Sequence, residues 1–227
     1  MRNISLVTGE IYHVCNRSTE GLKIFEKPSF AGRFVKTLYE CNSTGEGMRG
    51  FSRHPHKLDY ETNNKLVNVL AVVIMQNHFH LLVRQVINDG ITRWLHRSCT
   101  SFSRTFNLAN NRKGTLFMGR FRAIRVLEDS QLFHLLVYIH ANPLDLISKN
   151  WRNGEMRDWN KAKKFLTKYQ WSSLGLYCDD FEVAKGITDL INTAEIKDFI
   201  DGWGSIERGI KNWSERAMED IEGLVLE

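Results

Sequence analysis

Two apolar segments lie next to each other in the middle of the chain and constrain its fold more than any other feature. Residues 66–75 and 78–84 are mostly Val, Leu and Ile, and only Gln76 and Asn77 separate them. Two short apolar runs joined by two turn-forming residues are typical of a β-hairpin. The sequence therefore predicts two antiparallel strands joined by a tight turn.

The segments around this hairpin alternate between strand and helix patterns. Residues 10–16 are β-branched and aromatic, as strands are, and Pro28 opens a segment with apolar residues at helical spacing. Strands separated by helices, with one antiparallel hairpin, indicate an α+β fold in which helices pack on a sheet. The predicted helices are residues 28–41, residues 91–106 and a segment that Asp129 or Ser130 can cap and that ends near Asn142, before Pro143.

Composition divides the chain into a body and a tail. We expect residues 1–178 to form one domain, interrupted at about residues 43–64 by a polar, glycine-containing loop or insertion. Residues 179–227 are predicted to be an acidic helical extension, because Ile187, Leu190, Ile191 and Ala194 recur at helical spacing.

The net charge of +5 is unevenly distributed between these two parts. Residues 1–178 contain 26 Lys and Arg against 13 Asp and Glu, whereas residues 179–227 contain 5 against 13. A basic body suggests a polyanionic partner. The acidic tail either covers that basic surface or packs as an additional helical layer.

Basic residues are densest between residues 84 and 125, where nine Lys and Arg face only Asp89 as an acid. On the predicted helix 91–106, the arginines fall opposite the apolar side, an arrangement suited to following phosphates. The ordinary alternative is a solvated surface, and for Phe117 and Phe121 burial is the alternative to stacking on bases. The candidate phosphate-binding residues are Arg93, Arg97, Arg104, Arg112, Lys113, Arg120, Arg122 and Arg125.

Neither a membrane segment nor a disulfide framework is expected. The longest unbroken apolar run, residues 69–75, is too short to cross a bilayer, and no signal peptide is recognised at the N-terminus. The four cysteines are far apart in the sequence and are interpreted as buried or idle thiols in a reducing compartment, the cytoplasm.

The His78-Phe79-His80 segment is the strongest candidate for chemistry. Side chains alternate along a strand, so both imidazoles point to one face while Phe79 points into the core. Two imidazoles on a rigid strand form half of a metal site. The same spacing also arises from surface or capping histidines, and that alternative stays open here.

The predicted helix ending near Asn142 presents three polar side chains along one edge. His134, Tyr138 and Asn142 are each four residues apart, and Tyr138 is expected at the boundary of the core, where it can enter a cleft. A boundary tyrosine with a hydrated hydroxyl, and an asparagine that caps the helix, are the structural alternatives.

Several segments together resemble a known family. Residues 73–83, which contain the sequence MQNHFHLLV, resemble the HUH motif of single-tyrosine transposases, which include insertion-sequence enzymes and REP-associated tyrosine transposases. The resemblance covers roughly residues 8–178 and departs at Gln76, where many relatives have proline. The other similar segments, in the family's order, are residues 12–17, 117–122, 138–143 and 171–173.

This resemblance implies a ferredoxin-like fold, similar to an RNA-recognition module, and a metal-dependent nicking and joining reaction on single-stranded DNA beside a hairpin. It implies Tyr138 as the nucleophile that forms a 5′-phosphotyrosine, and His78, His80 and Asn142 as ligands of Mg²⁺ or Mn²⁺. A homodimer with a shared active site is known in the family. His134 is a candidate general base for Tyr138.

A module that binds nucleic acid without catalysis is the main alternative function. A phosphoesterase with paired His-x-Thr motifs is disfavoured because no such pair occurs, and a two-tyrosine enzyme is disfavoured because Tyr138 has no second tyrosine on its helix.

Overall fold

The structure is a computed structural model that describes residues 5–45, 65–148, 150–153, 156 and 158–213. Most of the predicted insertion at residues 43–64 therefore lies outside the described residues. Among the described residues, no helix combines the length and the apolar character needed to cross a membrane.

A four-stranded antiparallel sheet forms the centre of the molecule, with the strand order β2-β3-β1-β4. One helix, α1 (Pro28–Glu40), connects β1 to β2, and a second, α2 (Gly90–Ala109), connects β3 to β4. This βαββαβ connection with its strand order is the ferredoxin-like arrangement, so the predicted α+β fold class is confirmed. The strands are β1 (Ile11–Arg17), β2 (Val67–Ile74), β3 (His78–Gln85) and β4 (Arg122–Arg125).

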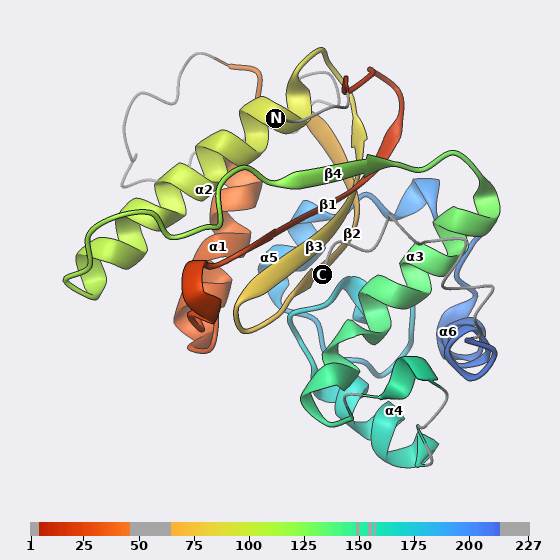
Figure 1. Cartoon of the computed structure of the whole chain (residues 1–227). Coiled ribbons are helices and arrows are strands. Elements are labelled where there is room, and N and C mark those ends of the chain that lie inside the picture. The colour runs from red at the N-terminus through yellow and green to blue at the C-terminus, as the bar shows by residue number, and fades with distance from the viewer. Residues whose placement is uncertain (1–4, 46–64, 149, 154–155, 157, 214–227) are drawn as a thin grey trace.

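One face of the sheet is covered by α1 and α2 (Figure 1). Phe79, Leu81 and Val83 from β3 are fully buried there, together with Trp94 of α2. These residues are the ones that strand alternation and helical spacing place on the apolar side, so the predicted hairpin and the predicted helix 91–106 are both confirmed.

The opposite face of the sheet is covered by α3 (Asp129–Ala141), which packs against β2 and β3 (Figure 1). The cap predicted at Asp129 or Ser130 is wrong, because the helix begins at Asp129 and its N-terminal cap is Glu128, which makes no side-chain capping hydrogen bond. At the other end, Asn142 retains helical dihedral angles, and a short 3-10 segment, Asn142–Leu146, continues the chain.

The described part of the tail packs onto both layers. A short helix, α5 (Lys185–Leu190), lies against α1, and α6 (Gly202–Lys211) lies against α3. Gly209 allows the close approach of α6, because a Cβ at this position would lie 2.5 Å from Cγ2 of Val137. The helical repeat predicted through Ile191 and Ala194 ends at Leu190, because Ile191 instead forms a parallel bridge with Val69.

The segment between these layers holds α4 (Trp159–Lys168), whose N-terminal cap is the Asp158 side chain. The residues of α4 and α6 that face inward share one apolar cluster with α3. The division of the chain into residues 1–178 and 179–227 stays a prediction.

Candidate active site

Two histidines of β3 project from the face of the sheet that α3 covers. The ring centroids of His78 and His80 lie 5.0 Å apart, with perpendicular planes. His80 is almost completely buried, whereas His78 is partly exposed at the start of the strand. The two imidazoles therefore converge from one rigid element, as the His-x-His spacing predicts.

Tyr138 of α3 lies against His80 at the contact between helix and sheet. Its ring centroid lies 5.4 Å from that of His80, in an edge-to-face arrangement. The strand residues and the helix residue come together within one chain, so this pair is complete without a second copy. Asn142 follows one helical turn later and is fully buried.

The contact made by Nδ1 of each imidazole determines which of its two ring nitrogens is left to bind a metal. Nδ1 of His78 lies 2.7 Å from Oδ1 of Asn77, and an amide oxygen can only accept, so a neutral His78 carries its proton on Nδ1. Nδ1 of His80 lies 3.0 Å from Nε2 of His13 in β1. His13 was given no role by the sequence, although strand alternation in β1 places it on this face.

Two buried groups at this site lack a hydrogen-bond partner in the part of the chain that the structure describes. They are Nε2 of His80 and both polar atoms of the Asn142 amide. Buried polar atoms without partners are uncommon and suggest that another species completes them. An imidazole lone pair and an amide oxygen are donors that a divalent cation such as Mn²⁺ or Mg²⁺ accepts.

The proposed ligand set contains two histidines and an amide. Among the described residues, no group of three His, Cys, Asp or Glu side chains is arranged to hold a metal ion. Such a set carries no negative charge, so it suits an exchangeable ion that shares its coordination with a phosphate more than a caged structural ion.

Electrostatics at this site favour neutral imidazole and an anionic ligand. Burial lowers the pKa of His80 well below its ordinary value, and nearby positive charge adds to the effect, so His80 is neutral and able to donate a lone pair. The contributing neighbours are His13, His78, Arg152 and Arg17.

The strand register adds two arginines to the same face. Residues paired across a sheet share a face, and Arg17 is paired with His78 while Arg122 is paired with Cys15. Both arginine side chains are exposed. Arg122 was predicted to contact phosphate, whereas Arg17 was missed because its alignment with His78 depends on pairing between distant strands.

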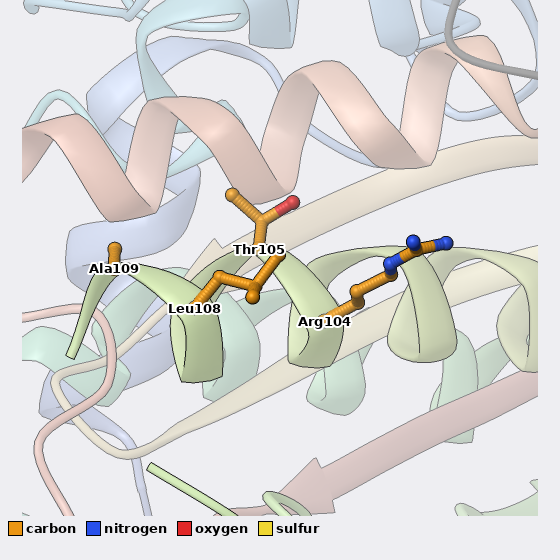
Figure 2. A pocket seen from close by; sticks show the side chains of 4 residues that line it. All are labelled: Arg104, Thr105, Leu108 and Ala109. Carbon is orange, nitrogen blue, oxygen red and sulfur yellow. The ribbon is translucent and has the colours of Figure 1, made fainter. Parts of the chain in front are cut away.

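The other candidate phosphate-binding residues lie elsewhere. Arg93, Arg97 and Arg104 belong to α2, on the opposite layer from Tyr138, and Arg97 donates to the carbonyl of Ser43. A pocket on α2 is lined by Arg104, Thr105, Leu108 and Ala109, and none of these four residues is a candidate nucleophile or metal ligand (Figure 2).

The remaining basic candidates occupy the α2–β4 connection and the edge strand. Arg112 is held by Asn107 and Thr19, and Arg125 forms a 2.7 Å ion pair with Glu10. Lys113 and Arg120 are exposed. The eight candidate phosphate-binding residues are therefore spread over α2, the α2–β4 connection and β4, and do not form one cluster around the histidines.

The expected position of Tyr138 at the boundary of the core is wrong, because its side chain is 0% exposed. Trp213 covers it, with ring centroids 6.4 Å apart and planes 28° from parallel, and the Arg152 guanidinium lies 5.2 Å from the Tyr138 ring centroid. The helical wheel gives the direction of a side chain but not which distant segment packs over it. His134, the candidate base, lies against the same tryptophan.

Phe117 is not available for stacking on bases. It is buried in an aromatic cluster between the sheet and the α1–α2 layer, so the alternative of burial is correct for this residue. Phe121 is partly buried. The cluster around Phe117 consists of Phe25, Phe34, Phe79 and Phe102.

Comparison with known proteins finds a likeness to solved structures but not to known sequences. No protein-family model and no curated protein matches the chain. A solved structure of a REP-associated tyrosine transposase bound to a REP hairpin is similar over 78% of this chain and 83% of that chain, with 12% sequence identity and a TM-score of 0.47. A likeness at this level does not assign an activity.

Proposed function

We propose that this protein is a metal-dependent enzyme that nicks and rejoins single-stranded DNA, a transposase or a domesticated relative of one. The observation that carries the proposal is the contact between the Tyr138 ring and His80, with centroids 5.4 Å apart. A phenol beside the buried imidazole of His80, with His78 on the same strand and arginines on the same face, combines a nucleophile, a metal-binding pair and a phosphate-binding surface. The resemblance of the His78-Phe79-His80 and Tyr138 segments to HUH transposases supports the same assignment.

The proposed reaction is a phosphoryl transfer to Tyr138. The phenolic oxygen attacks phosphorus and loses its proton, the bond from phosphorus to the 3′-oxygen breaks, and the 3′-oxygen gains a proton. The products are a 5′-phosphotyrosine and a free 3′-hydroxyl. Because the phosphoester bond is conserved, a second 3′-hydroxyl can reverse the reaction and join a new strand without another energy source.

The residues that would hold the metal are His78, His80 and Asn142. A divalent cation at these ligands would withdraw charge from a non-bridging phosphate oxygen and make phosphorus more electrophilic. Arg17 and Arg122 would hold neighbouring phosphates and keep the strand on the histidine face.

The test is direct detection of the covalent intermediate. The full chain is incubated with Mn²⁺ and a labelled oligonucleotide that carries a single-stranded flank beside a hairpin, and the products are separated under denaturing conditions. We expect a labelled species with the mass of protein plus the 3′ fragment, and none when EDTA replaces Mn²⁺. A protein that binds the oligonucleotide but forms no adduct, even after the site is opened as described below, is the binding module of the alternative hypothesis.

Binding of the oligonucleotide is expected to depend strongly on salt. If about five phosphates are neutralised, the slope of log K against log salt is about −3 to −4 for a single strand. Replacing Arg122 with Ala removes one contact on the histidine face and should reduce the magnitude of this slope by about 0.7. Fluorescence anisotropy between 50 and 300 mM KCl measures the slope.

Lys36→Ala is the matched control for that measurement, because Lys36 is an exposed cation of α1, on the far side of the sheet. Its slope should equal that of the wild type. A slope near zero in the wild type, or equal changes in the Arg122 and Lys36 variants, contradicts the placement of DNA on the histidine face.

Access to Tyr138 requires displacement of Trp213, since a completely buried phenol cannot contact a phosphate. Truncating a buried tryptophan to alanine removes about 3–5 kcal/mol of packing, and each 1.4 kcal/mol is a factor of ten in population. Trp213→Ala should therefore increase the initial rate of adduct formation by at least about tenfold.

Trp159→Ala is the control for a general loss of stability, because Trp159 packs in the same apolar cluster on α4, whereas the indole stacked on Tyr138 is that of Trp213. Faster adduct formation in both variants would show that loosening, and not uncovering of Tyr138, is the cause. An unchanged rate of adduct formation in the Trp213 variant would contradict the proposal that Trp213 blocks access to Tyr138.

A further inference from the structure

His13 is a buried histidine that the proposed reaction does not use. It lies in β1, its side chain is 0% exposed, and its Nε2 atom is 3.0 Å from Nδ1 of His80. The two ring planes are within 11° of parallel. The rings are therefore joined through facing nitrogens, in the geometry of an N–H···N hydrogen bond.

Only one proton can lie between these two nitrogens, and its position decides what His80 offers on its other side. If the proton belongs to His13, a neutral His80 carries its own proton on Nε2. That N–H group would be buried without an acceptor among the described residues. A buried donor without a partner is costly, whereas a buried lone pair is tolerated more readily.

The opposite assignment leaves no unpaired donor on His80. Nδ1–H of His80 donates to Nε2 of His13, and Nε2 of His80 keeps its lone pair. His78 shows the same pattern, because its Nδ1 atom lies 2.7 Å from the Asn77 side-chain oxygen. In this assignment, Nδ1 of both His78 and His80 is hydrogen-bonded, and Nε2 of both rings is left to coordinate a metal.

We propose that His13 is a positioning residue for the metal site, which accepts the Nδ1–H of His80 and so fixes the tautomer and ring orientation that present Nε2 of His80 to a divalent cation. This inference rests on the proposed role of His80 as a metal ligand. Ligand histidines commonly donate their second N–H to a carboxylate, a backbone carbonyl or water, and removing that partner lowers metal affinity about 10- to 100-fold. Here a neutral imidazole takes that place, which adds no negative charge to the site.

The position of His13 makes this role specific. The Cα partner of His13 on β3 is Leu82, and the partner of His80 on β1 is Cys15, so the two histidines meet diagonally on the shared face. The edge of the His13 ring also faces Tyr138, with centroids 6.2 Å apart. His13 therefore contacts both His80 and the proposed nucleophile, Tyr138.

The tautomer of His80 can be read without any activity measurement. Long-range ¹H–¹⁵N NMR of metal-free, ¹⁵N-histidine-labelled full-length protein distinguishes a protonated from an unprotonated Nε2. We expect an unprotonated Nε2 and a protonated Nδ1 in the wild type. A protonated Nε2 on His80 in the wild type overturns the proposal, whether or not any variant folds.

Two variants then test the effect on the metal. His13→Leu removes the acceptor, and His13→Gln keeps an acceptor oxygen that can reach His80. We expect Mn²⁺ affinity, measured by electron paramagnetic resonance on the metal-free protein, to fall 10- to 100-fold in the leucine variant and to recover within about threefold of the wild type in the glutamine variant. Equal affinity in all three proteins contradicts the positioning role.

The role of His13 and the proposed strand transfer are contradicted by different results. If the wild type forms a Mn²⁺-dependent adduct but the leucine variant retains the tautomer and the affinity, only the role of His13 is wrong. If the tautomer and the Mn²⁺ affinity respond as expected but no adduct forms in any protein, the site binds metal without the proposed strand transfer.

Discussion

Tyr138→Phe is expected to abolish covalent attachment to the oligonucleotide, with adduct formation reduced below detection, at least about a thousandfold. The substitution removes only the oxygen that attacks phosphorus, and no second nucleophile is assigned to this site. Binding of the uncleaved oligonucleotide should remain within about twofold of the wild type, because Arg17 and Arg122 are unchanged. Denaturing electrophoresis measures the adduct and fluorescence anisotropy measures binding.

Tyr39→Phe is a matched control, because Tyr39 is a partly buried tyrosine of α1, on the opposite layer of the sheet. It should form the adduct at the wild-type rate. If the adduct persists in the Tyr138 variant and is lost in the Tyr39 variant, the nucleophile is Tyr39 and the role proposed for Tyr138 is contradicted.

His80→Ala is the second change with a large expected effect. It removes a buried nitrogen, Nε2, that has no hydrogen-bond partner among the described residues, and it removes a proposed metal ligand. We expect Mn²⁺-dependent nicking to fall by at least about a hundredfold, since loss of even the partner of a ligand histidine costs 10- to 100-fold. Initial rates of nicking, measured over a range of Mn²⁺ concentrations, test this expectation.

His96→Ala is the control, because His96 is an exposed histidine of α2. It should leave the rate unchanged. Thermal unfolding of the His80 variant must be followed in parallel, because its side chain is buried. A folded His80 variant that nicks at the wild-type rate removes the proposed metal role of this residue.

Local sequence patterns predict those parts of the fold that depend on neighbouring residues. The two turn residues Gln76 and Asn77 end one apolar run and precede the next, which is enough to define the β2–β3 hairpin. Strand alternation places His78 and His80 on one face, and helical spacing gives the buried side of α2.

The remaining parts of the site depend on contacts between distant segments. His13 is 67 residues from His80 in sequence, and their hydrogen bond requires β1 to lie beside β3 in one register. The same register brings Arg17 beside His78. A one-residue shift would turn these side chains to the other face, and no local pattern in β1 determines that shift.

The burial of Tyr138 has a similar cause. Its helical position predicts an edge of α3, and a three-layer structure without α6 would leave that edge open. Gly209 allows α6 to approach α3 closely, and Trp213, immediately beyond α6, then fills the space beside the phenol. The acidic tail therefore contributes to the site through packing, which its charge alone does not predict.

The central claim is that the Tyr138 oxygen becomes bonded to DNA. Its most direct test is to digest the adduct formed by the Trp213→Ala protein with trypsin and nuclease and to identify the modified peptide by mass spectrometry. If Tyr138 is the nucleophile, we expect a nucleotide 5′-phosphate on Tyr138 and on no other residue. A nucleotide on a different side chain, or complete coverage of the Tyr138 peptide without modification in a protein that nicks DNA, would contradict it.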